Sequence, residues 1–202
     1  MPKVKPETSQ ARRDEILAAA ETCFAREGFH QSTIRHVIRE SGLSAGCIYG
    51  YFPTKDDLIR AMGERRHAHD AALLSARDKS ADPIAALRRI AREFLSDLQQ
   101  EEGLRTRRVG LQLWAEALRS DEVKAQVVRG TRAPIAAITE LLRRGQRLGL
   151  IDRKIDPPST ARAMVAMFQG FVLQSVWGEP FEISAALKTF DVLLRGLAPA
   201  TR

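Results

Sequence analysis

The stretch SGLSAGCIYGYF, residues 41–52, decides how this sequence is interpreted. Glycine recurs at every fourth position from 42, which is unfavourable for an isolated helix. Ile48 and Phe52 nevertheless keep helical spacing, so we expect them to face a core. Tyr49 and Tyr51 would then point away from it. The stretch therefore predicts a short helix with one buried face and one open face that carries tyrosines.

A second short helix is predicted just before this stretch, over residues 33–41. Ser32 or Thr33 would cap it, and its inward side would carry Val37 between two isoleucines. Gly42 would turn the chain, and Ser44 would cap the helix that follows. Two short helices joined in this way match a helix-turn-helix, whose second helix enters the major groove of DNA. Small residues in that helix would let its backbone approach the duplex.

Two further helices frame this motif. Residues 9–28 carry a one-sided apolar stripe, and Gly28 is expected to end that helix in the left-handed conformation. Pro53 would end the motif, and Thr54 would cap a fourth helix. The stripe comprises Ile16, Ala20, Cys23 and Phe24.

The rest of the chain shows helical periodicity with no sustained alternation typical of strands, which predicts an all-α protein of about nine helices. One break is expected at Gly103, and Pro134 is expected to kink or split a long helix. The expected later helices cover residues 55–76, 82–101, 104–120, 121–149, 156–178 and 181–197.

The net charge of +7 over 202 residues does not by itself locate a DNA-binding surface. Residues 1–60 hold nine Lys or Arg against eight Asp or Glu, so most of the excess lies beyond them. No apolar run approaches the about 20 residues of a membrane span. The start lacks the apolar centre of a secretion signal, and two cysteines make no disulfide framework. We expect a cytoplasmic protein with no membrane association.

The segment ILAAAETCFAREGFHQSTIRHVIRESGLSAGCIYGYFPTKDDL, residues 16–58, resembles the DNA-binding domain of the tetracycline-repressor (TetR) family. The resemblance implies an all-α homodimeric regulator. Residues 1–54 would form the helix-turn-helix DNA-binding domain, and residues 55–202 would form a larger helical domain that binds an effector and dimerises. The fourth helix would connect effector site and DNA-binding domain.

The matched positions imply specific roles in DNA binding. Thr33, Tyr49, Tyr51 and Lys55 would contact phosphates, whereas Arg35, Ala45, Gly46 and Cys47 would meet base edges. Ser44 belongs to the same set. An arginine such as Arg35 can make a bidentate contact to guanine. Lys3, Lys5, Arg12 and Arg13 could add a flexible basic arm.

Candidates for an effector pocket come from the apolar faces of the larger domain. Arg108 falls on a stripe with Leu104, Leu111 and Ala115, where it would either extend its charge to the surface or meet an anionic effector. The other candidates, each equally explained as core or interface packing, are His69, Phe94, Trp114, Phe168 and Gln169.

The predicted helices over residues 156–178 and 181–197 are apolar on more than one side, and helices of this kind must bury two faces. One face would pack within the chain, and the other would meet a second copy in a four-helix interface. The residues assigned to that interface are Val165, Gly170, Val172 and Val176.

These patterns predict a sequence-specific DNA-binding regulator, a repressor released from a palindromic operator by an unknown small molecule. An enzyme is not expected, because nucleophile-elbow, phosphate-loop and zinc motifs are missing from the sequence. No cofactor or metal is expected. The alternative is an architectural or helical interaction protein that binds DNA without sequence preference and responds to no effector.

Overall fold

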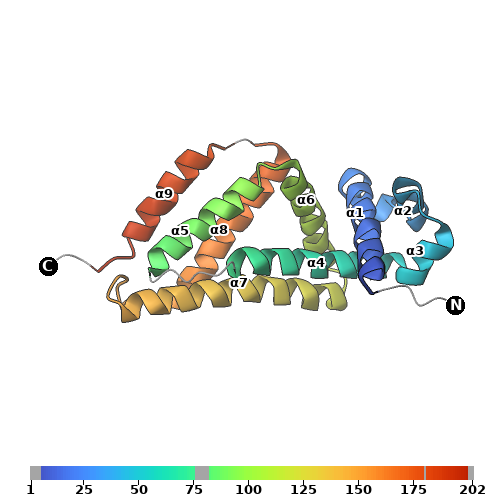
Figure 1. Ribbon diagram of the computed structural model, residues 1–202. Coiled ribbons are helices and arrows are strands. Elements are labelled where there is room, and N and C mark those ends of the chain that lie inside the picture. Colours follow the sequence, from blue (N-terminus) through green and yellow to red (C-terminus); the bar gives the residue numbers. More distant parts are fainter. Residues whose placement is uncertain (1–5, 76–81, 180, 200–202) are drawn as a thin grey trace. The chain divides into compact units, whose positions relative to one another are not determined.

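The computed structural model describes residues 6–75, 82–179 and 181–199. Over these residues the chain forms nine α-helices and no strand, which confirms the all-α class (Figure 1). The helices are α1 Pro6–Gln31, α2 Ile34–Ser41, α3 Ala45–Tyr51, α4 Lys55–Ser75, α5 Pro83–Asp97, α6 Glu101–Glu116, α7 Asp121–Arg147, α8 Pro157–Trp177 and α9 Ile183–Arg195. Within the described ranges, no helix combines the length and apolar character needed to cross a membrane.

The chain divides into two compact units. The first comprises residues up to Arg66 together with residues 108–127, and the second comprises residues 67–107 and 128–202. Helices α4, α6 and α7 each continue from one unit into the other. The domain boundary expected after residue 54 stays a prediction.

The first unit is built around the apolar side of α1. Phe24 packs edge to face on Phe29, with ring centroids 5.1 Å apart. All four residues of the expected α1 stripe are buried, and Ile48 and Phe52 of the quoted stretch join them in one core. Further members come from α2, α4 and α6: Val37, Leu58, Met62, Val109 and Leu113.

Gly28 breaks α1 near its end, with φ 80° and ψ 163°. The positive φ was expected, but this ψ lies outside the left-handed helical region, in a range open almost only to glycine. The expectation of a left-handed cap is therefore corrected. The chain extends at Gly28, and Phe29 then packs back on Phe24.

Side-chain caps begin several helices as expected. Ser44 Oγ accepts from the N–H of Cys47 at 3.2 Å, and Thr54 Oγ1 accepts from the N–H of Asp57 at 3.1 Å. The start of α2 differs. Thr33 stands at the cap position without a side-chain capping bond, and the Ser32 hydroxyl donates instead to the carbonyl of Cys23 at 3.4 Å.

Two expected helix breaks are wrong. Gly103 lies inside α6, and it is needed for close packing, since a Cβ there would lie 2.0 Å from the carbonyl oxygen of Asp97. Pro134 lies inside α7, which is not split. A glycine or proline therefore does not mark a helix end where the surrounding packing supports the helix.

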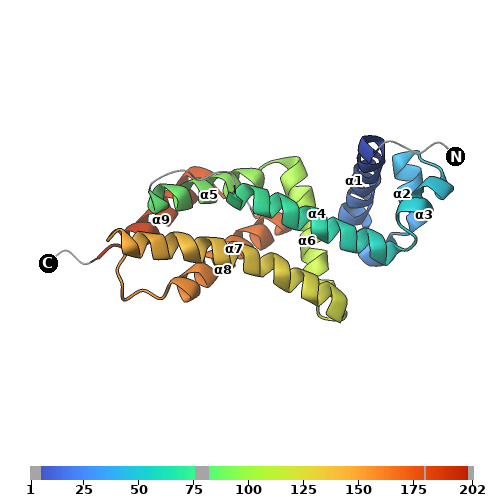
Figure 2. The same cartoon turned by 60° about the horizontal axis from the view of Figure 1, so that its bottom comes forward.

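Three helices of the second unit meet through aromatic side chains. Phe168 of α8 lies 5.2 Å from Phe94 of α5 and 5.6 Å from Phe190 of α9, measured between ring centroids. Figures 1 and 2 show α5 alongside α9, where Arg88 Nε donates to Asp191 Oδ1 at 2.6 Å. The caps of α5 and α8 are Asp82 and Asp156.

Asp57→Asn should flatten the dependence of stability on acid pH. Hydrogen bonds from Thr54 hold the pKa of Asp57 below its ordinary value of 3.8. A carboxyl whose pKa is lowered by folding stabilises the fold above its ordinary pKa, and this contribution is lost as pH falls through the lowered value. Between about pH 5 and about pH 2.5, the wild type should lose more stability in urea unfolding than Asp57→Asn. Parallel pH profiles would contradict this role of Asp57.

Candidate nucleic-acid interface

The helix-turn-helix is formed as the sequence predicts. Gly42 ends α2 in the left-handed conformation, with φ 68° and ψ 7°, and its N–H donates to the carbonyl of Ile38 at 3.1 Å. Leu43 packs against the core of the first unit, and Ser44 then caps α3. The turn and the cap together set the direction in which α3 leaves α2.

Helix α3 has one buried face and one open face. Ile48 is fully buried and Phe52 nearly so, whereas Tyr49 is 47% exposed. The other residues of the open face are small: Ser44, Ala45, Gly46 and Gly50, all exposed. Thr33 and Arg35 at the start of α2 are exposed as well, and Cys47 is half-buried. The expected division of α3 into a core side and an open side is confirmed for Tyr49.

Tyr51 is placed differently from Tyr49. It is half-buried, packs against the core of the first unit, and its hydroxyl donates to Ser9 Oγ of α1 at 3.3 Å. The expectation that both tyrosines point away from the core is corrected for Tyr51, because its ring helps to close the space between α1 and α3.

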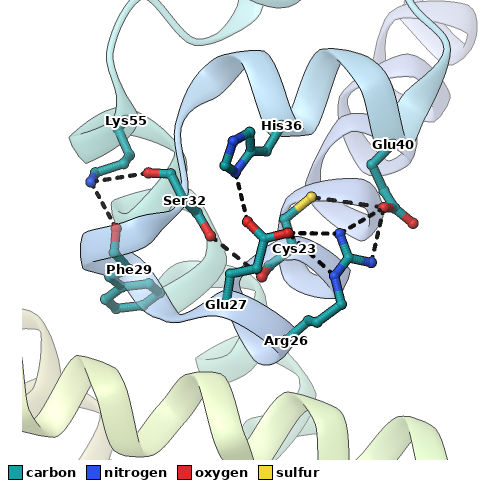
Figure 3. Close-up of polar contacts among 8 residues, drawn as sticks. All are labelled: Cys23, Arg26, Glu27, Phe29, Ser32, His36, Glu40 and Lys55. Atoms are coloured by element: carbon teal, nitrogen blue, oxygen red, sulfur yellow. Dashed lines mark hydrogen bonds and ion pairs between the residues drawn. The ribbon is translucent and has the colours of Figure 1, made fainter.

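Lys55 is held inside the first unit. Its Nζ donates to the carbonyls of Phe29 at 2.7 Å and Ser32 at 3.3 Å (Figure 3). Both carbonyls belong to the chain between the break at Gly28 and the start of α2. The ammonium group ties α4 to the segment that leads into the helix-turn-helix, and the expected contact of Lys55 with a phosphate stays a prediction.

A chain of ion pairs holds α2 against α1 (Figure 3). Arg26 donates to Glu40 at 3.2 Å and to Glu27 at 3.0 Å, and Glu27 lies 2.6 Å from Nδ1 of His36. The hydrogen bond from Arg26, assisted by His36, holds the pKa of Glu27 below its ordinary value. Burial raises the pKa of the nearby Cys23 thiol, which fits a core role.

The residues predicted as a basic arm do not form one within the described part of the chain. Lys3 and Lys5 lie outside the described residues. Arg12 lies within α1 and pairs with Glu15 at 2.6 Å. Arg13 lies beside it, with its guanidinium 5.3 Å from the ring centroid of Phe52. These two arginines are helical residues with partners in the first unit.

The predicted effector residues are only partly brought together. Phe94 and Phe168 are in contact in the second unit with their rings tilted, and Gln169 of that unit is half-buried. Trp114 belongs to the first unit and lies under the guanidinium of Arg66. The side chain of His69 lies outside the described residues. The structure therefore gathers two of the six candidates in direct contact.

Arg108 is exposed, and the buried arginine is its neighbour Arg107, which is 1% exposed. Arg107 donates to Asp97 at 3.1 Å and lies 4.7 Å from the ring centroid of Phe94. The predicted stripe through Arg108 was one residue out of phase. The buried stripe runs through Gly103, Arg107 and Gly110. These residues also have helical spacing, so periodicity alone did not distinguish the two stripes.

Two of the predicted dimer residues are covered by their own chain. Val165 and Val172 are 7% and 2% exposed, so they offer almost no area to a partner in this conformation of the chain. Gly170 and Val176 are half-buried. The exposed large apolar residues of α8 and α9 are instead Trp177, Val192 and Leu193.

Comparison with known proteins divides the chain into two matched parts. Residues 16–62 match the family described as bacterial regulatory proteins, tetR family. Residues 83–199, more than half of the chain, match the C-terminal part of BetI-type transcriptional repressors. The first match contains the helix-turn-helix, and the second covers most of the larger helical region.

Individual relatives agree with both matches. The HTH-type transcriptional regulator TtgR of Pseudomonas putida is 28% identical over 80% of this chain and 77% of its own length. The HTH-type transcriptional repressor AcnR of Corynebacterium diphtheriae is 28% identical over 74% and 73%. Among solved structures, the SmeT–triclosan complex is 26% identical with a TM-score of 0.73, covering 93% of this chain and 89% of SmeT. A TetR-family regulator from Rhodococcus sp. has the same fold, with 24% identity, a TM-score of 0.79 and coverages of 93% and 98%.

Lys55→Met should lower the free energy of unfolding by about 1–3 kcal/mol, because two carbonyls would lose a charged donor. Urea unfolding followed by circular dichroism measures this change. Arg35→Met, which removes an exposed cation from the same motif, should change stability by less than about 0.5 kcal/mol. Equal effects of the two substitutions would show that Lys55 does not act as an internal tie.

Proposed function

Because the chain belongs to the tetR family of bacterial regulatory proteins and is a DNA-binding transcriptional regulator, we propose that it is a repressor that acts as a homodimer on a palindromic operator. A small molecule bound to the larger helical region would release it. The observation that carries this proposal is α3, whose open face combines small residues with the exposed Tyr49 while Ile48 and Phe52 anchor its other face.

The open face supports a specific set of DNA contacts. Ala45 and Gly46 leave the backbone of α3 free to approach base edges, and the exposed Arg35 has the geometry for guanine. Tyr49 can donate its hydroxyl to a phosphate. The residues proposed to touch DNA directly are Thr33, Arg35, Ser44, Ala45, Gly46, Cys47 and Tyr49.

For Lys55 and Tyr51 we propose an indirect contribution to DNA binding. Lys55 donates to the chain that leads into α2, and Tyr51 bonds Ser9 on α1. Each side chain would keep the motif in place and leave the phosphate contacts to the exposed residues.

The exposed apolar side chains of α8 and α9 support dimer formation. Trp177, Val192 and Leu193 are at least half exposed in the single chain, and apolar surface of this kind marks a site for a protein partner. A two-fold dimer would present two α3 helices to successive major grooves, about 34–36 Å apart. Gly170 and Val176 stay in the proposed surface.

We place the effector site in the second unit. The support is the aromatic pair of Phe94 and Phe168 beside the buried Arg107, and the similarity to SmeT, which was solved with triclosan. A ligand that prefers one arrangement of these helices would shift the separation of the two α3 helices and so weaken binding to a fixed operator spacing.

Selection from a random-sequence duplex pool tests this function. The wild-type protein should enrich one palindromic sequence, and it should bind that duplex at least about 1,000-fold tighter than a scrambled one at the same salt concentration. If the protein enriches no sequence and binds unrelated duplexes with equal affinity, the result would favour the architectural alternative.

Tyr49→Phe should weaken binding to the selected duplex about tenfold, because one hydroxyl-to-phosphate hydrogen bond is lost. Its unfolding curve should match the wild type, since Tyr49 is exposed. Tyr51→Phe is the matched comparison, since the chain has two tyrosines: it loses the internal bond to Ser9, so it should lower the free energy of unfolding by about 1 kcal/mol and weaken DNA binding less than Tyr49→Phe does. The reverse ranking in a mobility-shift titration would overturn the assignment of the two hydroxyls.

Leu193→Glu should produce monomers in sedimentation velocity, because a charge would be buried at the proposed α8–α9 surface. Leu148→Glu is the control: it changes an exposed leucine outside α8 and α9 and should leave the dimer intact. A dimer that survives Leu193→Glu would refute this surface.

A further inference from the structure

Backbone groups on both sides of the break at Gly28 have a side-chain partner outside α1. The carbonyl of Phe24 lies in the last turn before the break, four residues before Gly28. The N–H of Phe29 follows the break, where the extended ψ of Gly28 turns it away from the helical ladder. Phe24 and Phe29 are both buried, and buried backbone groups of this kind require partners.

Gln112 of α6 supplies both partners. Its Oε1 accepts from the N–H of Phe29 at 2.7 Å, and its Nε2 donates to the carbonyl of Phe24 at 2.8 Å. One amide group therefore bridges the two sides of the break. These residues are more than 80 positions apart in sequence but belong to the same compact unit.

Side chains from two other helices bind the N–H and the carbonyl of Phe29. Gln112 of α6 binds its N–H. Lys55 of α4 binds its carbonyl at 2.7 Å, as Figure 3 shows. The next residues lead directly into α2, and Ser32 N–H closes the turn by donating to the carbonyl of Gly28 at 3.2 Å. The direction in which α2 and α3 leave α1 thus depends on two distant helices.

A pocket of the first unit borders the bridge formed by Gln112. Its volume is about 380 Å³. The pocket is lined by Glu27, Gly28, Phe29, His30, Gln31, Gln112, Ala115, Glu116 and Arg119. The lining therefore includes both the break and the side chain that bridges it.

Helix α6 carries a second buried polar anchor. Arg107, five residues before Gln112, binds Asp97 and covers Phe94 in the second unit. Arg107 and Gln112 both belong to α6, whose residue range crosses the boundary between the two units.

We propose that Gln112 is a positioning residue for DNA binding: its amide fixes the chain at Gly28 and through it the placement of α2 and α3. The affinity for DNA then depends on the position of α6, in addition to the α4 connection expected from the sequence. This inference rests on the proposed function, because its readout is binding to a specific duplex.

Gln112→Met tests the proposal, because it keeps the length of the side chain and removes both hydrogen bonds. Binding to the duplex selected by the wild type is measured at a temperature where every variant is folded. We expect Gln112→Met to lose at least about tenfold in affinity. Gln112→Glu keeps the acceptor for Phe29 and should recover part of that loss.

Val109→Ala is the matched control. It removes core volume from the same helix and the same unit without touching the break, so it should lower stability and keep DNA affinity within about twofold. In addition, bound duplex should slow hydrogen exchange of the Phe29 amide in the wild type but not in Gln112→Met, since coupling between two sites is reciprocal.

The outcomes are distinct. If the wild type selects no duplex, the proposed function itself fails. If it selects one and Gln112→Met binds that duplex as tightly, the positioning role is overturned. An equal loss of affinity in Gln112→Met and Val109→Ala would assign the effect to general destabilisation and would overturn it as well.

Discussion

The helix-turn-helix depends on the burial of two side chains, Ile48 and Phe52, in the core around α1. Helix α3 has seven residues, and helices of that length are not stable alone. Its glycines lower the intrinsic preference further. Tertiary burial on one side therefore maintains the helix, and it leaves the other side free for small residues and for Tyr49. The same constraint explains why Ser44 must cap α3, since a helix of two turns has few other bonds at its start.

Charge in the first unit is used largely to hold helices together. Arg26 joins α1 to α2, Arg13 contacts Phe52, and Lys55 binds the segment between α1 and α2. This use of cations agrees with the nearly balanced charge of residues 1–60. In the proposed DNA complex, affinity would therefore rest on close backbone approach and hydroxyl donors as much as on net charge.

Three glycines illustrate three different physical needs. Gly42 adopts the left-handed conformation that turns α2 into α3, and Gly28 adopts an extended conformation with positive φ that breaks α1. Gly103 has no positive φ and instead allows the close contact of α6 with the carbonyl of Asp97. The break at Gly28 is the one with long-range consequences, because the residue after it, Phe29, is bound by side chains from α4 and α6.

The sequence by itself determined the all-α class, the turn at Gly42, the caps at Ser44 and Thr54, and the division of α3 into a core side and an open side. Each of these depends on residues within a few positions of one another, so spacing is enough to predict it. Only the tertiary structure decided that Arg107 rather than Arg108 is buried, that Val172 is covered within the chain, and that Lys55 and Tyr51 bind internal partners. It also revealed the bridge from Gln112 to Phe24 and Phe29. These features depend on which faces of the helices pack together. Where a helix has apolar or small residues on two adjacent faces, both faces show the same helical spacing, so the sequence does not decide which one is buried.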